Sequence, residues 1–307
     1  MNPLDHLPHE HALTLSGIEH DLKRAEHSRA AALLHNRVSG AWRNPGVVKN
    51  KLETANLLAP SLTLTDYLEG QAQPPAHIWR GLWPGFKNVL GNADWGDCGE
   101  AMVAHGVEAM QAAAANLVTP FTPTDAISFY SIVGNFVQGA GPPGQNPTDN
   151  GTDNKVLMNK MQTMGLKCFS DGSVHKFTVA IDVPVGDEVA QKIAIAEFVV
   201  LFRAINLPMN AQGKSTWWLR GNGQTGDSAP GSWGGHDVPY VGYAVNGDYD
   251  CDSWGLLMPS GHRFDKVYGL QGLVCLSPDM MSRSGVSPTG LNYTKLMADI
   301  AKLGTPA

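Results

Sequence analysis

The spacing of hydrophobic and polar residues predicts helices in the first half of the chain and strands in the second. Residues 10–38, 99–116, about 124–136 and about 154–165 place apolar side chains at roughly helical spacing. From about residue 175 the pattern changes to short runs rich in Val, Ile, Phe and Tyr, which are typical of strands. This segregation of helices from strands predicts an α+β fold with two packed halves.

The strand-like runs also predict a hairpin. The runs are KFTVAIDV, AEFVVLFRAI, VPYVGYAV, YDCDSWGLLM and GLVCLSP, and a helical pattern at about 189–197 overlaps the second of them. Within residues 231–255, an NGD turn joins two strands. His236 begins the first of these strands and Asp252 lies in the second. Antiparallel pairing therefore brings the two side chains near each other.

The first 75 residues differ from the rest of the chain. The predicted helix at 10–38 is followed by residues 39–75, which lose periodicity and gain proline and glycine. We expect residues 1–75 to be an extension, because they hold too little apolar surface to fold alone. A docking arm, an inhibitory segment and a partner-binding segment all fit this pattern.

Composition and charge exclude several classes of protein. The chain has 307 residues, of which 43% are hydrophobic and 16% charged, enough to build a core. A net charge of −6 argues against nucleic acid as a partner. No run of 18 apolar residues is present, so we expect no membrane span. The first residues lack the features of a secretory signal, which favours a cytoplasmic location.

The four cysteines do not form a disulfide or zinc pattern. Cys168, Cys251 and Cys275 are widely spaced and no CxxC pair occurs, so we expect reduced thiols and no metal or other cofactor. Cys275, in the apolar run GLVCL, fits the core. Cys98 differs because it lies in a Gly-Asp-Cys-Gly turn at the start of the helix at 99–116, with Asp97 as a candidate N-cap. A thiol there fits packing, a disulfide, metal binding or nucleophilic attack.

Cys98, His236 and Asp252 together fit nucleophilic chemistry. A helix N-terminus and a nearby imidazolium both lower the pKa of a thiol, which produces the reactive thiolate. Asp252 can accept a hydrogen bond from the imidazole and so fix its orientation. The backbone N–H of Cys98 and the side-chain amide of Asn92, six residues earlier, can stabilise the developing oxyanion.

These blocks resemble the papain-like cysteine peptidases. The resemblance rests on Asn92 followed by Cys98, on HDVPYVGY beginning at His236, and on DSWG beginning at Asp252. His236 follows Cys98 by 138 residues, within the range of about 130–150 that papain-like enzymes show. The blocks GDCGEAMVAH and GSWGGHDVPYVGY are similar to a poorly characterised set of papain-like proteins from bacteria and phages. The resemblance covers roughly residues 76–290.

The resemblance implies a fold and a set of roles. It implies a papain-like domain at 76–307, with a helical half at about 90–170, a β-rich half at about 171–290 and a cleft between them. Cys98 is then the nucleophile, His236 the base and later the acid, Asp252 the residue that orients His236, and Asn92 an oxyanion donor. Trp254 shields the His–Asp pair. We expect Gly99 and Trp233 at the cleft wall and His105 in the packing of its helix.

Asn92, Asp252 and Gly99 depart from the family pattern. The family usually carries glutamine, asparagine and, in its best-known branch, tryptophan at these positions.

The implied function is a cysteine-dependent hydrolase that cleaves peptide or isopeptide bonds through an acyl-enzyme, without a cofactor. Its substrate is then a peptide or protein, and residues 1–75 can dock a protein partner. Two alternatives stay open. One is a structural or virion-associated protein with little turnover, carried in a phage particle. The other is a peptidoglycan cross-bridge hydrolase or a transglutaminase-like acyl transferase.

Overall fold

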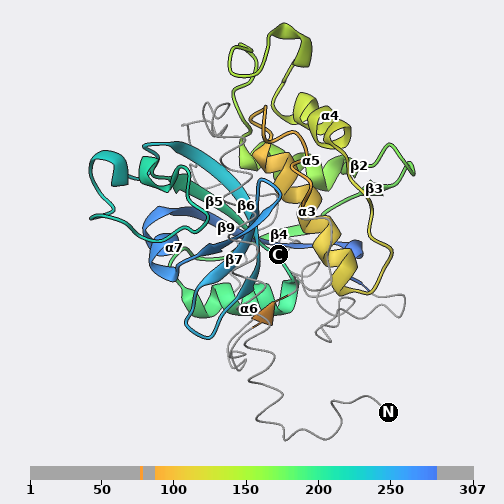
Figure 1. Ribbon diagram of the computed structural model, residues 1–307. Helices are drawn as coiled ribbons and strands as arrows, with labels where there is room; N and C mark the ends of the chain where they lie inside the picture. The colour runs from red at the N-terminus through yellow and green to blue at the C-terminus, as the bar shows by residue number, and fades with distance from the viewer. Residues whose placement is uncertain (1–76, 79–86, 282–307) are drawn as a thin grey trace, which may run out of the picture.

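The computed structural model describes residues 77–78 and 87–281, and every structural statement below concerns these residues (Figure 1). The predicted helix at 10–38 and the extension at 1–75 lie outside them, so both stay predictions. The predicted α+β class is confirmed, since helices and a large antiparallel sheet make up the described chain.

The helices lie close to the predicted positions. They are α3 (Cys98–Ala113), α4 (Pro123–Val133), α5 (Asn154–Thr163), α6 (Glu188–Phe198) and α7 (His262–Tyr268). Short 3₁₀ segments are η3 (Gln138–Ala140), η4 (Met209–Ala211), η5 (Gly226–Ser228) and η6 (Pro278–Met280). The first four helices were expected; α7 was not, since its stretch was read as part of the β-rich half.

Side chains at the helix starts explain where α4 and α5 begin. Thr122 and Asp125 form a reciprocal capping box around α4, and Pro123 occupies its first turn, one residue before the predicted start. Asp153 caps α5 by accepting hydrogen bonds from the backbone of its first turn. Asp97 occupies the predicted N-cap position of α3, although its side chain makes no capping hydrogen bond.

The main sheet has seven strands, and all of its pairings are antiparallel. Its strands are β1 (His77–Ile78), β4 (Val179–Asp182), β5 (Leu201–Leu207), β6 (Gly234–Tyr243), β7 (Tyr249–Ser253), β8 (Leu256–Ser260) and β9 (Gly269–Leu276). The order is β4-β9-β5-β6-β7-β8, with β1 also paired to β6. A small second sheet joins β2 (Leu166–Lys167) to β3 (Val174–His175).

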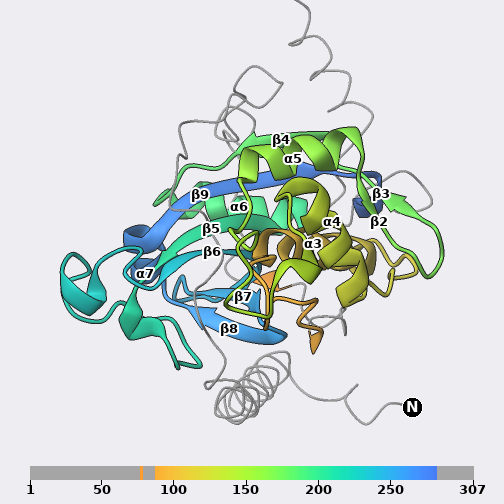
Figure 2. The ribbon, with the colours of Figure 1, turned by 90° about the horizontal axis from the view of Figure 1, so that it is seen from above.

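The hairpin of β6 and β7 agrees with the sequence prediction. Tyr240 lies opposite Cys251 and Tyr243 lies opposite Tyr249. All ten residues of β6 are buried: α3 and α6 pack against the strand, and it lies inside the sheet between β5 and β7 (Figure 2). The hairpin therefore holds His236 and Asp252 inside the molecule.

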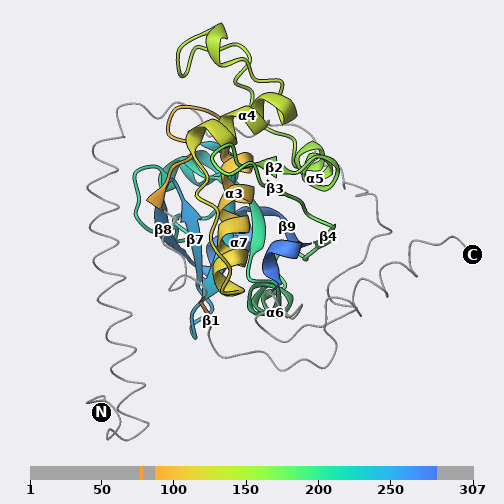
Figure 3. The ribbon, with the colours of Figure 1, turned by 90° about the vertical axis from the view of Figure 1, so that its right-hand side faces the viewer.

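Helix α3 is the central helix of the domain. Every residue of α3 except Ala113 is buried, and the helix runs along β6, with α4 and α5 on its outer side (Figure 3). Gly106 permits the close approach to the sheet, because a Cβ atom there would overlap the ring of Phe202 on β5. Helix α6 packs beside the sheet against β6, β9 and β5.

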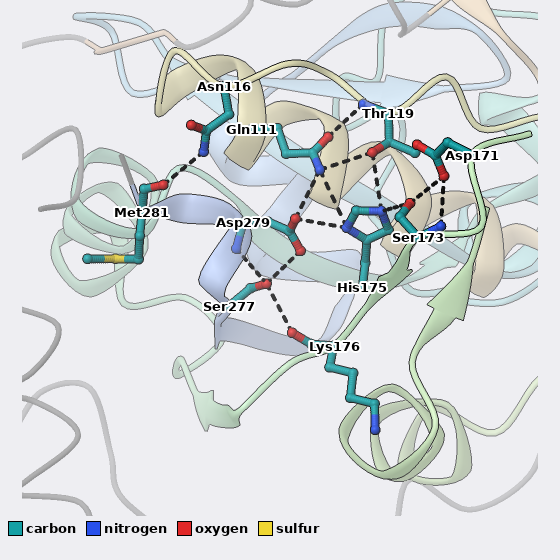
Figure 4. Close-up of polar contacts among 10 residues, drawn as sticks. All are labelled: Gln111, Asn116, Thr119, Asp171, Ser173, His175, Lys176, Ser277, Asp279 and Met281. Atoms are coloured by element: carbon teal, nitrogen blue, oxygen red, sulfur yellow. Dashed lines mark hydrogen bonds and ion pairs between the residues drawn. The ribbon is translucent and has the colours of Figure 1, made fainter. Parts of the chain in front are cut away.

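A polar cluster fastens η6 to the C-terminal end of α3 (Figure 4). His175 places Nδ1 2.8 Å from Oδ1 of Asp279, and Gln111 donates to the same oxygen at 2.9 Å. The other ring nitrogen of His175 contacts the hydroxyls of Ser173 and Thr119. These contacts join β3, α3 and η6, so the cluster holds the end of the described chain against α3.

In the described part of the chain, none of the helices combines the length and the apolar character needed to cross a membrane.

Candidate active site

Cys98 is the first residue of α3 and is 1% exposed. The preceding turn is held by backbone hydrogen bonds from Asp94 and Trp95 to the carbonyl of Gly91. The N–H of Gly96 donates to Asp149, which ties this turn to the polar loop at 139–153. The thiol therefore occupies a fixed position at a helix N-terminus, as the sequence predicted.

The four residues predicted to be catalytic line one small cavity. Cys98, His236, Asp252 and Asn92 all border it, as does Trp254. The space open to the centre of a water molecule is about 10 Å³, roughly enough for one water. Other residues that line it include Val89, Ala101, Met102, His105, Asp237, Pro239 and Ser253. The predicted wall residues Gly99 and Trp233 are not among its lining residues.

The ring of His236 is held on two sides. Its Nε2 lies 2.9 Å from Oγ of Ser253. Trp254 stacks on the imidazole, with ring centroids 4.3 Å apart and planes 15° apart, and Trp233 packs against Trp254 in turn. Nδ1 of His236 has no hydrogen-bond partner among the described residues. Among the described residues, Ser253 is therefore the hydrogen-bond partner of the ring.

Burial sets the protonation of the Cys98–His236 pair. It lowers the pKa of His236 to about 3, so the imidazole is neutral at physiological pH. Burial, followed by the charge of Asp237, raises the pKa of the Cys98 thiol well above its ordinary value. The sequence instead predicts that the helix N-terminus lowers the pKa of the Cys98 thiol. Desolvation and nearby carboxylates outweigh that effect, and the resting pair is thiol and neutral imidazole.

Asp252 contacts a histidine other than His236. Its Oδ2 lies 3.5 Å from Nε2 of His105, on α3. No hydrogen bond joins Asp252 to His236 within the described chain, so the predicted orienting contact is not formed there. Burial raises the pKa of Asp252 to about 7, although the charge of His105 lowers it.

His105 belongs to a buried charged group, whereas the sequence suggested simple packing. Its Nδ1 lies 3.1 Å from Oε2 of Glu108, and its Nε2 lies 2.8 Å from the carbonyl oxygen of Asn88. Burial lowers the pKa of His105, but Asp252, Glu108 and the Asn88 carbonyl together outweigh it and raise the pKa to about 9. His105 is therefore an imidazolium at neutral pH.

Asn92 and Gly99 occupy constrained positions near the thiol. The Nδ2 group of Asn92 donates to the carbonyl of Trp95 at 3.2 Å, so its amide is engaged within the turn while bordering the cavity. A Cβ at Gly99 would lie 3.0 Å from Cδ2 of Leu157 and 3.4 Å from Oδ2 of Asp237. The close packing explains why a large side chain is absent at position 99.

Three buried carboxyl groups surround the start of α3. Thr152 donates to Glu100 at 2.8 Å and Asn154 donates to Asp237 at 2.9 Å, from the end of the polar loop and the start of α5. Burial raises the pKa values of Glu100 to about 8 and of Asp237 to about 7. Burial and Glu100 raise the pKa of Asp97 well above its ordinary value. Within the described ranges, no three His, Cys, Asp or Glu side chains are arranged to hold a metal ion.

Sequence reasoning missed Ser253, His105 and Asp237. Each was visible as a neighbour of a predicted residue: Ser253 follows Asp252, Asp237 follows His236, and His105 lies two turns after Cys98. Side chains alternate between faces along a strand, so pairing register decides whether Asp252 or Ser253 meets the imidazole.

Comparison with known proteins identifies the fold. No family model matches the chain, and no curated protein matches it. Among solved structures, xylellain, a cysteine protease from Xylella fastidiosa, has 15% sequence identity and a TM-score of 0.56, and the match covers 76% of this chain and 97% of that one. This chain has a papain-like fold.

Two other papain-like structures give the same result. A procathepsin L2 proteinase from the larval midgut of Tenebrio molitor has 13% identity and a TM-score of 0.53, with 76% of this chain and 78% of that chain covered. A structure from work on the mite allergens Blo t 1 and Der p 1 has 15% identity and a TM-score of 0.51, covering 75% and 80%. The papain-like fold expected from the resemblance is confirmed.

Proposed function

We propose that this papain-like protein is a cysteine-dependent hydrolase that cleaves peptide or isopeptide bonds. One observation supports the proposal above all: Cys98 at the start of α3 and His236 at the start of β6 border the same cavity. The free Nδ1 of His236 gives the site a base, and the thiol gives it a nucleophile.

The proposed reaction begins with proton transfer from Sγ of Cys98 to Nδ1 of His236. The thiolate attacks the carbonyl carbon, and the negative oxygen accepts hydrogen bonds from the Cys98 N–H and from the Asn92 amide. The His236 imidazolium then donates its proton to the departing amine, which leaves a thioester on Cys98. Water, activated by His236, hydrolyses the thioester and restores the thiol. Asp252, the third member of the proposed triad, contributes negative charge beside the cavity.

A peptide is much larger than the water-sized cavity, so the cavity has to widen before a peptide carbonyl reaches Sγ. Entry of a polar substrate also lessens the desolvation that now disfavours the thiolate. We therefore propose that substrate binding and formation of the ion pair occur together.

The small size of the cavity and the raised pKa of Cys98 favour a second candidate. In this candidate the papain-like fold serves a structural or virion-associated role with little turnover. Both candidates have the same fold, but the structural candidate predicts that the Cys98 thiol is unreactive.

Thiol labelling separates the two candidates. We expect iodoacetamide or a peptide epoxide to modify Cys98 about tenfold faster than Cys275 at neutral pH, because Cys98 shares a cavity with the imidazole of His236. Cys275 is the internal control, since it is a buried free thiol in the core. Mass spectrometry of digested protein measures each rate. Cleavage of a peptide library should be lost in Cys98→Ser. Equally slow labelling of all four thiols contradicts the hydrolase.

A further inference from the structure

We propose that Ser253 is the positioning residue that orients His236, and that His105 holds Asp252 apart from the imidazole. This inference rests on the proposed function, because it assigns the hydrogen-bonding partner of the proposed base. It separates two tasks, orientation of the ring and supply of negative charge, that a single Asp252 was expected to perform.

The contact between Ser253 and His236 is the only hydrogen bond that the ring makes within the described chain, and it is 2.9 Å long. Ser253 is 3% exposed and is the last residue of β7, where it pairs with Leu256 of β8. Two strands of the sheet therefore hold the hydroxyl in place. Trp254 covers a face of the same ring, so both the tilt and the rotation of the imidazole are restricted.

The hydrogen bond to Ser253 is compatible with the tautomer that catalysis needs. A neutral imidazole carries its proton on one nitrogen only. When Nε2–H donates to Oγ of Ser253, Nδ1 keeps a lone pair, and Nδ1 is the nitrogen without a partner. His236 can then take the proton of Cys98 while its other N–H stays bonded to the hydroxyl. Ser253 thus performs through its oxygen the orienting task assigned to Asp252 from the sequence.

Asp252 is directed to the other side of β7. Successive residues of a strand point to opposite faces, so a strand that turns Ser253 toward His236 turns Asp252 toward α3. There Oδ2 lies 3.5 Å from Nε2 of His105. Glu108 lies 3.1 Å from the other ring nitrogen of His105, so the positive imidazole is placed between two carboxyl groups. This arrangement compensates the buried charge of Asp252 without involving His236.

A hydroxyl partner has a chemical consequence for the reaction. It stabilises the His236 imidazolium by one hydrogen bond but brings no negative charge, whereas a bonded carboxylate would bring both. The negative charge that balances the His236 imidazolium then comes from the Cys98 thiolate itself. The reactive ion pair should therefore form mainly when substrate or reagent is bound at the thiol.

Kinetic variants test the assignment. Ser253→Ala should lower the rate of Cys98 alkylation by iodoacetamide about tenfold near neutral pH, because a ring without this hydrogen bond presents Nδ1 less often. Ser253→Thr keeps the hydroxyl and should recover most of the rate. Ser260→Ala is the matched control: it removes another buried serine hydroxyl, which contacts Tyr240 at 3.2 Å on β6, and should keep the parent rate. An unchanged rate in Ser253→Ala overturns the proposal.

Nitrogen NMR of the histidine rings tests the same contact without requiring turnover. With the full-length protein labelled in histidine and His236→Gln used for assignment, Ser253→Ala should move the Nε2 signal of His236. Asp252→Asn should instead move the ring signals of His105. The reverse pattern, with His236 responding to Asp252→Asn alone, overturns the proposal. If Cys98 of the parent protein does not react at any pH, the proposed function fails, and the ring signals still decide whether Ser253 orients His236.

Discussion

At the scale of single residues, the pKa of the Cys98 thiol depends on the carboxyl group of Asp237, which is not a member of the predicted triad. Asp237 borders the same cavity, and its charge is the second cause, after burial, of the raised pKa of Cys98. Asn154 holds one oxygen of Asp237, and the other oxygen has no hydrogen-bond partner in the described chain. Asp237 therefore opposes formation of the thiolate.

Replacing Asp237 with asparagine should make the thiol more acidic. Asp237→Asn keeps the shape of the side chain and removes its negative charge, so the pKa of Cys98 should fall. Alkylation of Cys98 at pH 7 should become about tenfold faster, which corresponds to a pKa lower by about one. The measurement is the pH profile of the alkylation rate. Asp227→Asn, at an exposed position in η5, is the charge-matched control. A profile that does not move shows that Asp237 has no influence on the thiol.

The sequence predicted Cys98 at a helix start and His236 on a strand, and both line one cavity, but it did not predict the contacts around them. Cys98 and His236 were identifiable because Cys98 begins α3 and His236 lies two residues after the start of β6, and both elements have a recognisable pattern. Whether Asp252 or Ser253 points toward His236 depends on the register between β6 and β7. A bulge between Tyr240 and Gly242 shifts that register. Residue types alone do not encode such a shift. The charge of His105 likewise depends on Asp252 and Glu108 being brought to it by folding.

At the scale of elements, α3 was predictable because its pattern is long and uninterrupted, and its observed start is one residue from the predicted one. The shortest elements were not predictable. β1, β2 and β3 have two residues each, too few to show alternation, and they exist because a partner strand is present. Helix α7 has seven residues, and its buried side chains, including Phe264 and Tyr268, also suit a strand.

The packing of α3 on the sheet gives a prediction at this scale. Gly106→Ala should destabilise the protein by roughly 1–3 kcal/mol, because the new methyl group overlaps the ring of Phe202 and forces α3 away from β5. Chemical denaturation measures the free energy of unfolding. Gly139→Ala is the control, since a Cβ there meets no atom within 4 Å. Equal stability of the two variants would mean that α3 does not depend on this close approach.

At the scale of the whole molecule, the buried imidazole of His236 links folding to pH. Its pKa is about 3 when folded and about 6.5 in an unfolded chain, so the unfolded state binds more protons between these values. The contribution of His236 therefore destabilises the fold as the pH falls from about 6.5 toward about 3. One proton changes the free energy of unfolding by at most about 1.4 kcal/mol per pH unit.

Comparing the parent protein with His236→Gln isolates this contribution. Glutamine does not titrate, so the variant should lose less stability than the parent between pH 6.5 and pH 4.5. Urea unfolding at a series of pH values gives the difference. Above pH 6.5 the two curves should run parallel. Parallel curves over the acidic range as well would show that His236 is not protected from protonation by the fold.

Because α3 is buried along almost its whole length, the helix that carries the proposed nucleophile is also the central support of the domain. Its residues are thus under selection for folding whether or not the protein still turns over a substrate. A lineage that gave up catalysis would retain nearly the same helix and exchange only Cys98 and the groups facing it. Surveys of related genomes can therefore test the proposed roles at positions 98, 236 and 253 separately from the preservation of the surrounding helix.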